Sequence, residues 1–407
     1  MNTFKKYIVW VTIIATLATM SVPVATAYAA SLSDLTSQTT NSGGGKGIFD
    51  VLLGLLVGNL LSKVFHITPS GDGTTSGGSN PGSPGGSLTG TKEVMGFYAE
   101  WWGGDTSSYN DMTRNANTLK TIIPFWGTLQ ADGSVTDRGG NDHASVVKFA
   151  HQNNIKVLLM VNNAKQDSST PPVHTVLSSP TLRSTAINNL EAYIKQNNLD
   201  GINIDFEMVP AEDRDNLSDF MRELYQRLKP QGYIVSIDVF PKTDENNDVS
   251  VAYDFAQLAQ YADRIAIMTY DNHGTWSGPG PIAAINWVEA NLKYALKYIP
   301  KNKLYLGIAG YGYDWSSKGV ESLEYGAIQN LISRFGSTAQ WDDSSKSPYF
   351  TYTGTDGVSH TVWYENSRSL GYKLDLVNKY DIAGAALWKL GEEDPGAWKV
   401  FRDKLFQ

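Results

Sequence analysis

Two hydrophobic patterns alternate along the chain from Lys92 to its end. Short apolar runs predict buried β-strands, and stretches in which apolar residues recur every three or four positions predict amphipathic helices. The predicted strands are Val94–Tyr98, Thr121–Trp126, Lys156–Val161, Gly201–Glu207, Ile234–Val239, Arg264–Tyr270, Lys303–Ile308 and Ile382–Trp388. The predicted helices include Ala144–Asn153, Leu182–Gln196, Glu212–Leu228 and Ala283–Tyr298. Strands that alternate with helices pair in parallel, and eight of them in about 300 residues predict an α/β fold, the closed (β/α)8 TIM barrel. A doubly wound open sheet is the alternative.

The last two predicted strands are separated by more residues than the others. Their first residues, Lys303 and Ile382, lie 79 positions apart. The surplus predicts a small α+β insertion at about 315–375, between strands seven and eight. Within it, Tyr349–Thr353 and Thr361–Tyr364 have the composition of two strands joined by a glycine-containing turn.

Residues 1–30 have the pattern of an export signal peptide. Two lysines precede the apolar run Tyr7–Thr19, and a small-residue cleavage site follows at Ala27–Ala29. The apolar run is shorter than the ~20 residues that a membrane span needs, so an uncleaved anchor helix is the less favoured alternative. We therefore expect a secreted protein, extracellular or associated with the cell envelope.

Residues 31–67 form a second N-terminal segment. Its part from 48 to 67 is apolar on almost every side, which a solitary helix in water would not tolerate. Asp50 and Lys63 interrupt the run, which disfavours a full membrane span. We interpret 48–67 as a helix for self-association or for binding to an envelope layer, with attachment to a membrane surface as the alternative.

Residues 68–91 are rich in glycine, serine and proline and are typical of a flexible linker. The folded domain therefore comprises residues 92–407. The chain has no cysteine, so the domain depends on its hydrophobic core rather than on disulfides. Its formal net charge of −8 argues against a nucleic-acid partner, because binding to phosphates requires a basic face.

The predicted strand Gly201–Glu207 carries polar residues on one face only. Asn203, Asp205 and Glu207 alternate with two isoleucines and a phenylalanine, so the two sets face opposite ways. Two buried carboxyl groups this close repel each other, and we expect the pKa of at least one to be raised. Such a pair can combine a protonated acid with an ionised neighbour near neutral pH. A structural pair of hydrogen-bonded carboxylates is the alternative.

Aromatic residues gather where the predicted strands end, at the face where barrels of this type place their chemistry. Tyr98 and Trp101 follow strand one, and Trp388 ends strand eight. Aromatic rings fit the apolar faces of sugar rings, and nearby carboxylates can bind sugar hydroxyls. The pattern therefore favours a carbohydrate ligand.

Three motifs resemble those of glycoside hydrolase family 18. They are Asp200-Gly201-Ile202-Asn203-Ile204-Asp205-Phe206-Glu207, Met268-Thr269-Tyr270-Asp271 and Gly384-Ala385-Ala386-Leu387-Trp388. The first departs from the family signature only at Asn203, where the family has an aspartate. This variant and the inserted module, with Ser347–Phe350 and Val362–Glu365, resemble the bacterial spore and cell-wall N-acetylglucosaminidase branch.

The resemblance implies a retaining glycosidase that cleaves β-1,4-linked N-acetylglucosamine polymers, either peptidoglycan strands or chitin, with the acetamido oxygen of the substrate as nucleophile. Glu207 would be the general acid. Asp205 would hold the acetamide N–H, and Tyr270 would bind its oxygen. The residues expected to contact the substrate are Asn203, Tyr98, Met268, Asp271, Trp388 and Trp101.

Asn203, the histidines and Glu207 each lead to a further expectation. Because Asn203 cannot share a proton with Asp205, we expect Asp205 to rely on Glu207 and on the substrate. The histidines show no zinc-binding spacing, and the sequence indicates no metal and no cofactor. A non-catalytic glycan-binding protein is the alternative function, although lectin-like relatives usually lose the terminal glutamate that is present here as Glu207.

Overall fold

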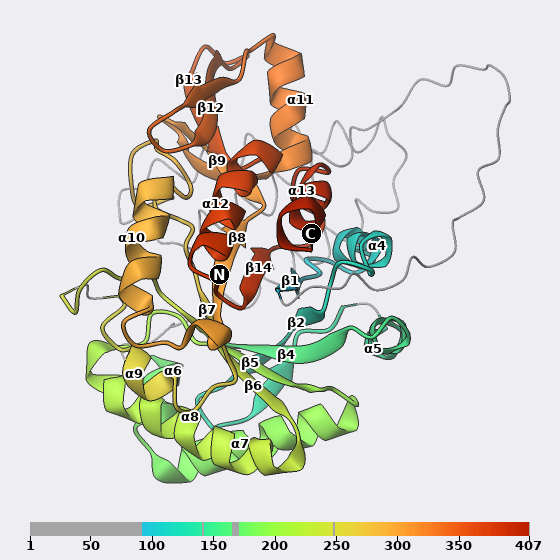
Figure 1. Ribbon diagram of the computed structural model, residues 1–407, viewed down its shortest axis with the longest axis vertical. Helices are drawn as coiled ribbons and strands as arrows, with labels where there is room; N and C mark the ends of the chain where they lie inside the picture. The colour runs from blue at the N-terminus through green and yellow to red at the C-terminus, as the bar shows by residue number, and fades with distance from the viewer. Residues whose placement is uncertain (1–91, 141, 165–170, 247–248, 407) are drawn as a thin grey trace, which may run out of the picture. The chain divides into compact units, whose positions relative to one another are not determined.

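The structure is a computed structural model that describes residues 92–406, apart from 141, 165–170 and 247–248 (Figure 1). The expected signal peptide, the apolar segment 48–67 and the linker lie outside the described residues. In the described part of the chain, no helix is long and apolar enough to cross a membrane.

Within the described residues, eight parallel strands form a closed barrel. They are β1 (Glu93–Tyr98), β2 (Thr121–Leu129), β4 (Lys156–Asn163), β5 (Gly201–Asp205), β6 (Ile234–Val239), β7 (Arg264–Ile267), β8 (Leu304–Ala309) and β14 (Gly384–Trp388). The barrel closes because β1 pairs with β2 on one side and with β14 on the other. A short strand, β3 (Val135–Asp137), pairs antiparallel with the end of β2. The predicted TIM barrel is confirmed, and the open sheet is excluded.

Helices connect the strands and cover the outside of the barrel. They are α4 (Ser107–Arg114), α5 (His143–Gln152), α6 (Pro172–Leu177), α7 (Pro180–Gln196), α8 (Arg214–Leu228), α9 (Phe255–Leu258), α10 (Ile285–Ala295), α12 (Ser367–Lys379) and α13 (Ala397–Leu405). Short 3₁₀ turns occur at Ala211–Asp213, Lys229–Gln231 and Lys301–Lys303. Local sequence sets the start of α7, where the Ser179 side chain accepts the backbone N–H of Leu182 and Pro180 takes the first helical position. Figure 1 shows α7 and α8 side by side next to β5 and β6.

The insertion between β8 and β14 forms a separate antiparallel sheet, drawn in orange in Figure 1. It contains β9 (Tyr311–Ser316), β10 (Gly319–Glu324), α11 (Tyr325–Phe335), β11 (Gln340–Asp342), β12 (Ser347–Thr353) and β13 (Ser359–Tyr364). The module thus spans residues 311–364 rather than the expected 315–375. It starts earlier because only Gly310 separates β8 from β9, and it ends earlier because α12 already belongs to the helical layer of the barrel.

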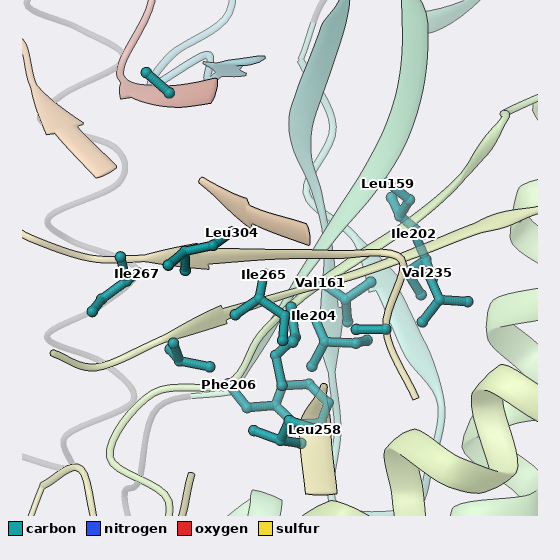
Figure 2. Close-up of a cluster of buried hydrophobic side chains, with 14 of the residues drawn as sticks. Leu159, Val161, Ile202, Ile204, Phe206, Val235, Leu258, Ile265, Ile267 and Leu304 are labelled. Atoms are coloured by element: carbon teal, nitrogen blue, oxygen red, sulfur yellow. The ribbon is translucent and has the colours of Figure 1, made fainter. Parts of the chain in front are cut away.

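The hydrophobic core lies mainly between the strands and the helices. Ile202 and Ile204 of β5 and Phe206 just after it face this layer and are almost completely buried, as the alternation predicts. Figure 2 shows Ile202 between its neighbours Leu159 of β4 and Val235 of β6, which are its partners in the sheet register. Each such side chain contributes about 1.5–3 kcal/mol by burial. This packing fixes β5 so that its polar face points into the barrel.

Candidate active site

A cavity opens at the C-terminal ends of the barrel strands. It is lined by Phe97, Met160, Asp205, Glu207, Asp238, Met268, Tyr270, Asp271, Tyr311 and Trp388. Most of these residues belong to the barrel strands β1, β4, β5, β6 and β14 or follow them directly. The others come from the segment after β7 and from β9 of the insertion. The site therefore depends on closure of the barrel and on the docking of the small sheet.

Glu207 is held at the mouth of this cavity by its backbone. Its N–H donates to Oδ1 of Asn163 over 2.8 Å, and Nδ2 of Asn163 donates to the Glu207 carbonyl over 3.0 Å. The residue before Glu207 is also held, because the Tyr253 hydroxyl donates to the Phe206 carbonyl over 2.5 Å. These three bonds fix the backbone on either side of Glu207, while its side chain stays accessible to solvent.

The carboxyl groups of the cavity have raised pKa values. Burial, together with the charges of Glu207 and Asp238, raises the pKa of Asp205 well above its usual value. Partial desolvation and the charge of Asp271 raise the pKa of Glu207, although its side chain reaches the open cleft. Burial, with a further contribution from Glu207, raises the pKa of Asp238 to about 8. The raised pKa values favour the protonated carboxyl, which is the form that a general acid requires.

Asp271 links the insertion to the active site. The Tyr311 hydroxyl donates to its Oδ1 over 2.6 Å, and the Tyr313 hydroxyl donates to the same oxygen over 3.1 Å. Its backbone adopts a positive φ of 55°, which turns the chain immediately after Tyr270. Asp271, Tyr270 and Met268 all line the cavity, so the motif Met268–Asp271 singled out from the sequence is brought to the site.

Trp388 and Trp101 form an aromatic wall. The Trp388 ring packs edge-to-face against Phe97, with a centroid distance of 5.3 Å, and against Trp101 at 6.5 Å. Trp388 lines the cavity. Trp101 remains 44% exposed and therefore lies at the rim.

Two predicted substrate contacts lie elsewhere. Tyr98 is completely buried in the layer between strands and helices, where its hydroxyl donates to Glu100 over 2.7 Å. Its neighbour Phe97 faces the cavity instead, because successive residues of a strand point to opposite faces. Asn203 is also completely buried and does not line the cavity, and its amide donates to Asp238. The expectation that both contact the substrate is therefore not supported by their placement.

Sequence comparisons fit this geometry. The family model described as "Glycosyl hydrolases family 18" matches residues 93–393. The chain belongs to glycosyl hydrolases family 18. Membership of this family, together with relatives named as glycosylases, chitinases and cortex-lytic enzymes, makes the protein a glycosidase and sets aside the non-catalytic alternative.

Two bacterial proteins are among those similar to this chain. The uncharacterized glycosylase YvbX of Bacillus subtilis (strain 168) is 32% identical over 321 residues, which cover 77% of this chain and 92% of that protein. The cortical fragment-lytic enzyme of Bacillus anthracis is 29% identical over 302 residues, covering 71% of this chain and 69% of that enzyme.

Two solved structures share the architecture of this family 18 domain. A chitinase from Chromobacterium violaceum superimposes with a TM-score of 0.71 at 32% identity, covering 78% of this chain and 99% of that one. The spore cortex-lytic enzyme SleL of Bacillus cereus also gives a TM-score of 0.71, at 25% identity, covering 80% of this chain and 76% of that one.

Several residues of this family 18 site were not predicted from the sequence. Asp238 is the most consequential, because it lies in the cavity beside Asp205 and Glu207. The signal was present in Ile234–Val239, where Ser236 and Asp238 alternate with apolar residues just as the polar residues of β5 do. Asn163 gave no signal, because a polar residue at the end of a strand is common.

Across the described ranges, no group of three or more histidine, cysteine, aspartate or glutamate side chains is positioned to hold a metal ion.

Proposed function

We propose that this family 18 glycosidase is exported and hydrolyses β-1,4-linked N-acetylglucosamine polymers with retention of configuration, using the acetamido group of the substrate as nucleophile. The observation that carries the proposal is the placement of Asp205, Glu207 and Tyr270 around one cavity. Export is supported by the signal-like sequence of residues 1–30.

In the first step, protonated Glu207 donates its proton to the glycosidic oxygen as the bond from that oxygen to C1 breaks. The acetamido carbonyl oxygen of the substrate bonds to C1 and forms a cyclic oxazolinium ion. The Asp205 carboxylate accepts the acetamide N–H and offsets the developing positive charge. The Tyr270 hydroxyl donates a hydrogen bond to the acetamide oxygen and orients it.

In the second step, the Glu207 carboxylate removes a proton from water. The water oxygen bonds to C1 as the oxazolinium ring opens, which restores the acetamide and returns Glu207 to its acid form. Both displacements occur at C1, so the configuration is retained. The arrangement supports this route because Asp205 and Asp238 come from adjacent strands beside Glu207, whereas a protein nucleophile would have to lie on the opposite side of the sugar ring. The remaining carboxyl of the cavity, Asp271, is engaged by the hydroxyls of Tyr311 and Tyr313.

Peptidoglycan is the substrate that we favour over chitin. The cortical fragment-lytic enzyme and the spore cortex-lytic enzyme SleL are similar over most of the folded domain, which supports a bacterial glycan as substrate. The chitinase from Chromobacterium violaceum has an equal TM-score, so chitin is the second candidate.

The proposal is tested with the full chain on three polymers: peptidoglycan glycan strands, chitin oligosaccharides and the same oligosaccharides after complete deacetylation. We expect cleavage of the N-acetylated polymers and at least about 100-fold slower cleavage of the deacetylated one, because the missing acetamide removes the nucleophile. NMR of the first product should show the β-anomer. Equal cleavage of all three, or an initial α-anomer, would contradict the mechanism.

Asp271 should extend the alkaline limit of activity. Catalysis requires protonated Glu207, so kcat falls as pH rises through the pKa of Glu207. Burial raises that pKa most, and the negative charge of Asp271 raises it further. Asp271→Asn removes the charge but keeps the Oδ1 that accepts from Tyr311 and Tyr313. We therefore expect the alkaline limb of the kcat–pH profile to move to lower pH, and a limb that stays in place or moves upward would refute the assignment.

A further inference from the structure

Asp238 and Asn203 form a buried pair beside the catalytic carboxyls. Nδ2 of Asn203 donates to Oδ2 of Asp238 over 2.5 Å, and the two residues are 0% and 1% exposed. The other carboxyl oxygen of Asp238, Oδ1, is buried and has no hydrogen-bond partner within the described ranges. Asp238 also lines the cavity, whereas Asn203 does not. One carboxyl oxygen is thus fixed by the amide, and the other is left for a partner within the cluster.

The register of the sheet places Asp238 at the level of Asp205. In the parallel pairing of β5 with β6, Asn203 is opposite Ser236 and Ile204 is opposite Ile237. One further position along both strands brings Asp205 level with Asp238, on the polar face that both strands turn into the barrel. Asp238 is therefore a lateral neighbour of Asp205, whereas the residue at 203 is its neighbour along the strand.

The residue that departs from the family signature, Asn203, is also the residue that hydrogen-bonds Asp238. The signature has an aspartate at the position of Asn203, where it is able to share a proton with Asp205. An asparagine has no such proton. In this chain a carboxyl group is instead available one strand away, held in place by the asparagine that replaced the usual aspartate.

We propose that Asp238 supplies, from β6, the carboxyl group with which Asp205 shares a proton, in place of the aspartate that the family signature has at position 203 on β5. This inference rests on the proposed function. In the free protein the two carboxyls hold one proton between them. When the substrate acetamide N–H reaches Asp205, the proton resides on Asp238 and Asp205 is the anion. When the product leaves, the proton is shared again, and no proton is gained or lost. Asp238 acts through Asp205 and is a positioning residue.

The surroundings of Asp238 favour this shared proton. The titratable groups that face it are Asp205, Glu207, Tyr253 and Tyr270, and all four are acids. Because none of these groups carries a positive charge, two adjacent anions are costly in the buried cluster, whereas one anion that accepts a hydrogen bond from a neighbouring acid is stabilised. Burial raises the pKa of both aspartates, in agreement with this geometry.

The central test is Asp238→Asn in the full chain. The variant keeps an oxygen for the Asn203 amide and replaces the acid O–H by an amide N–H, which donates a weaker hydrogen bond and cannot give up its proton. We expect kcat on N-acetylated oligosaccharides to fall about tenfold, with KM within about threefold. The acid limb of the kcat–pH profile should move to higher pH, because the amide stabilises the Asp205 anion less than the acid does. If Asp238 acted only by charge repulsion, this limb would move to lower pH. If its role were purely structural, the limb would not move. Either result would overturn the proposal.

The matched variant is the exchange Asn203→Asp with Asp238→Asn. It returns the carboxyl to the strand position of the family signature and keeps an amide–carboxyl pair. We expect kcat within about threefold of the wild type and an acid limb restored toward its original position. A double variant as impaired as Asp238→Asn alone would contradict the equivalence of the two positions.

A measurement without substrate separates this inference from the proposed function. In protein labelled with ¹³C at aspartate carboxyls, the resonances of Asp205 and Asp238 should titrate through the same pH steps, because coupled acids share macroscopic pKa values. Independent titrations would overturn the proton sharing even in an active enzyme. Conversely, a wild type that cleaves no N-acetylated glycan would contradict the proposed function, while the titration still decides whether the two carboxyls share a proton.

Discussion

Replacing Glu207 by glutamine is expected to lower kcat on N-acetylated glycans by about 10²–10⁴-fold. Glutamine has the shape of glutamate but cannot donate its proton to the leaving oxygen. The backbone bonds from Asn163 to residue 207 do not involve the side chain and remain. Binding of the substrate should therefore change little, and calorimetry with an N-acetylated oligosaccharide measures it beside turnover. Glu321→Gln, at an exposed position of β10, is the matched control and should leave kcat unchanged.

The same variant reports on the raised pKa of Glu207 through its stability. In the wild type this pKa lies above its value in the unfolded chain, so the folded state loses stability as pH rises through the folded pKa. Glutamine has no such dependence. We expect Glu207→Gln to raise the Tm relative to the wild type at pH 8 and to leave it nearly equal at pH 4. An active variant, or an inactive one with a lowered Tm at both pH values, would argue against the role of Glu207 as the acid.

Replacing Lys373 by methionine is expected to reduce the free energy of unfolding by about 3–5 kcal/mol. Nζ of Lys373 lies 2.6 Å from Oε2 of Glu365, and the two side chains are only 2% and 3% exposed. The Ser369 hydroxyl donates to the same oxygen. Without the lysine, Glu365 must remain charged in the core or take up a proton. Because Glu365 follows β13 and Lys373 belongs to α12, the pair connects the end of the inserted sheet to the helical layer of the barrel.

Urea unfolding at pH 7 measures this effect. Lys399→Met, which removes a lysine paired with Asp403 on an exposed surface, is the control and should cost less than about 1 kcal/mol. The double variant Glu365→Gln with Lys373→Met should recover part of the loss, because no buried charge remains unpaired. A single variant that loses no more than the control would show that the buried pair does not stabilise the docking of the insertion.

The contrast between β5 and β1 shows when a sequence reveals the faces of a strand. Polar and apolar residues alternate on β5, so the pattern alone predicts correctly that Asp205 and Glu207 point into the barrel. On β1, residues of both faces are apolar, because one face packs on helices and the other fills the barrel. The alternation then carries no information, and Tyr98 was expected at the cavity, where Phe97 lies instead.

By itself, the sequence determined the barrel, its inserted module and the direction of the polar residues on β5, because these depend on periodicity within single segments of the chain. Only the tertiary structure decided which side chains of different strands meet. The pairing of Asn203 with Asp238, and the contact of Asp271 with Tyr311 of the insertion, depend on register between strands and on docking between modules. Those features arise from hydrogen bonding and packing between distant segments, and no local pattern of residues encodes them.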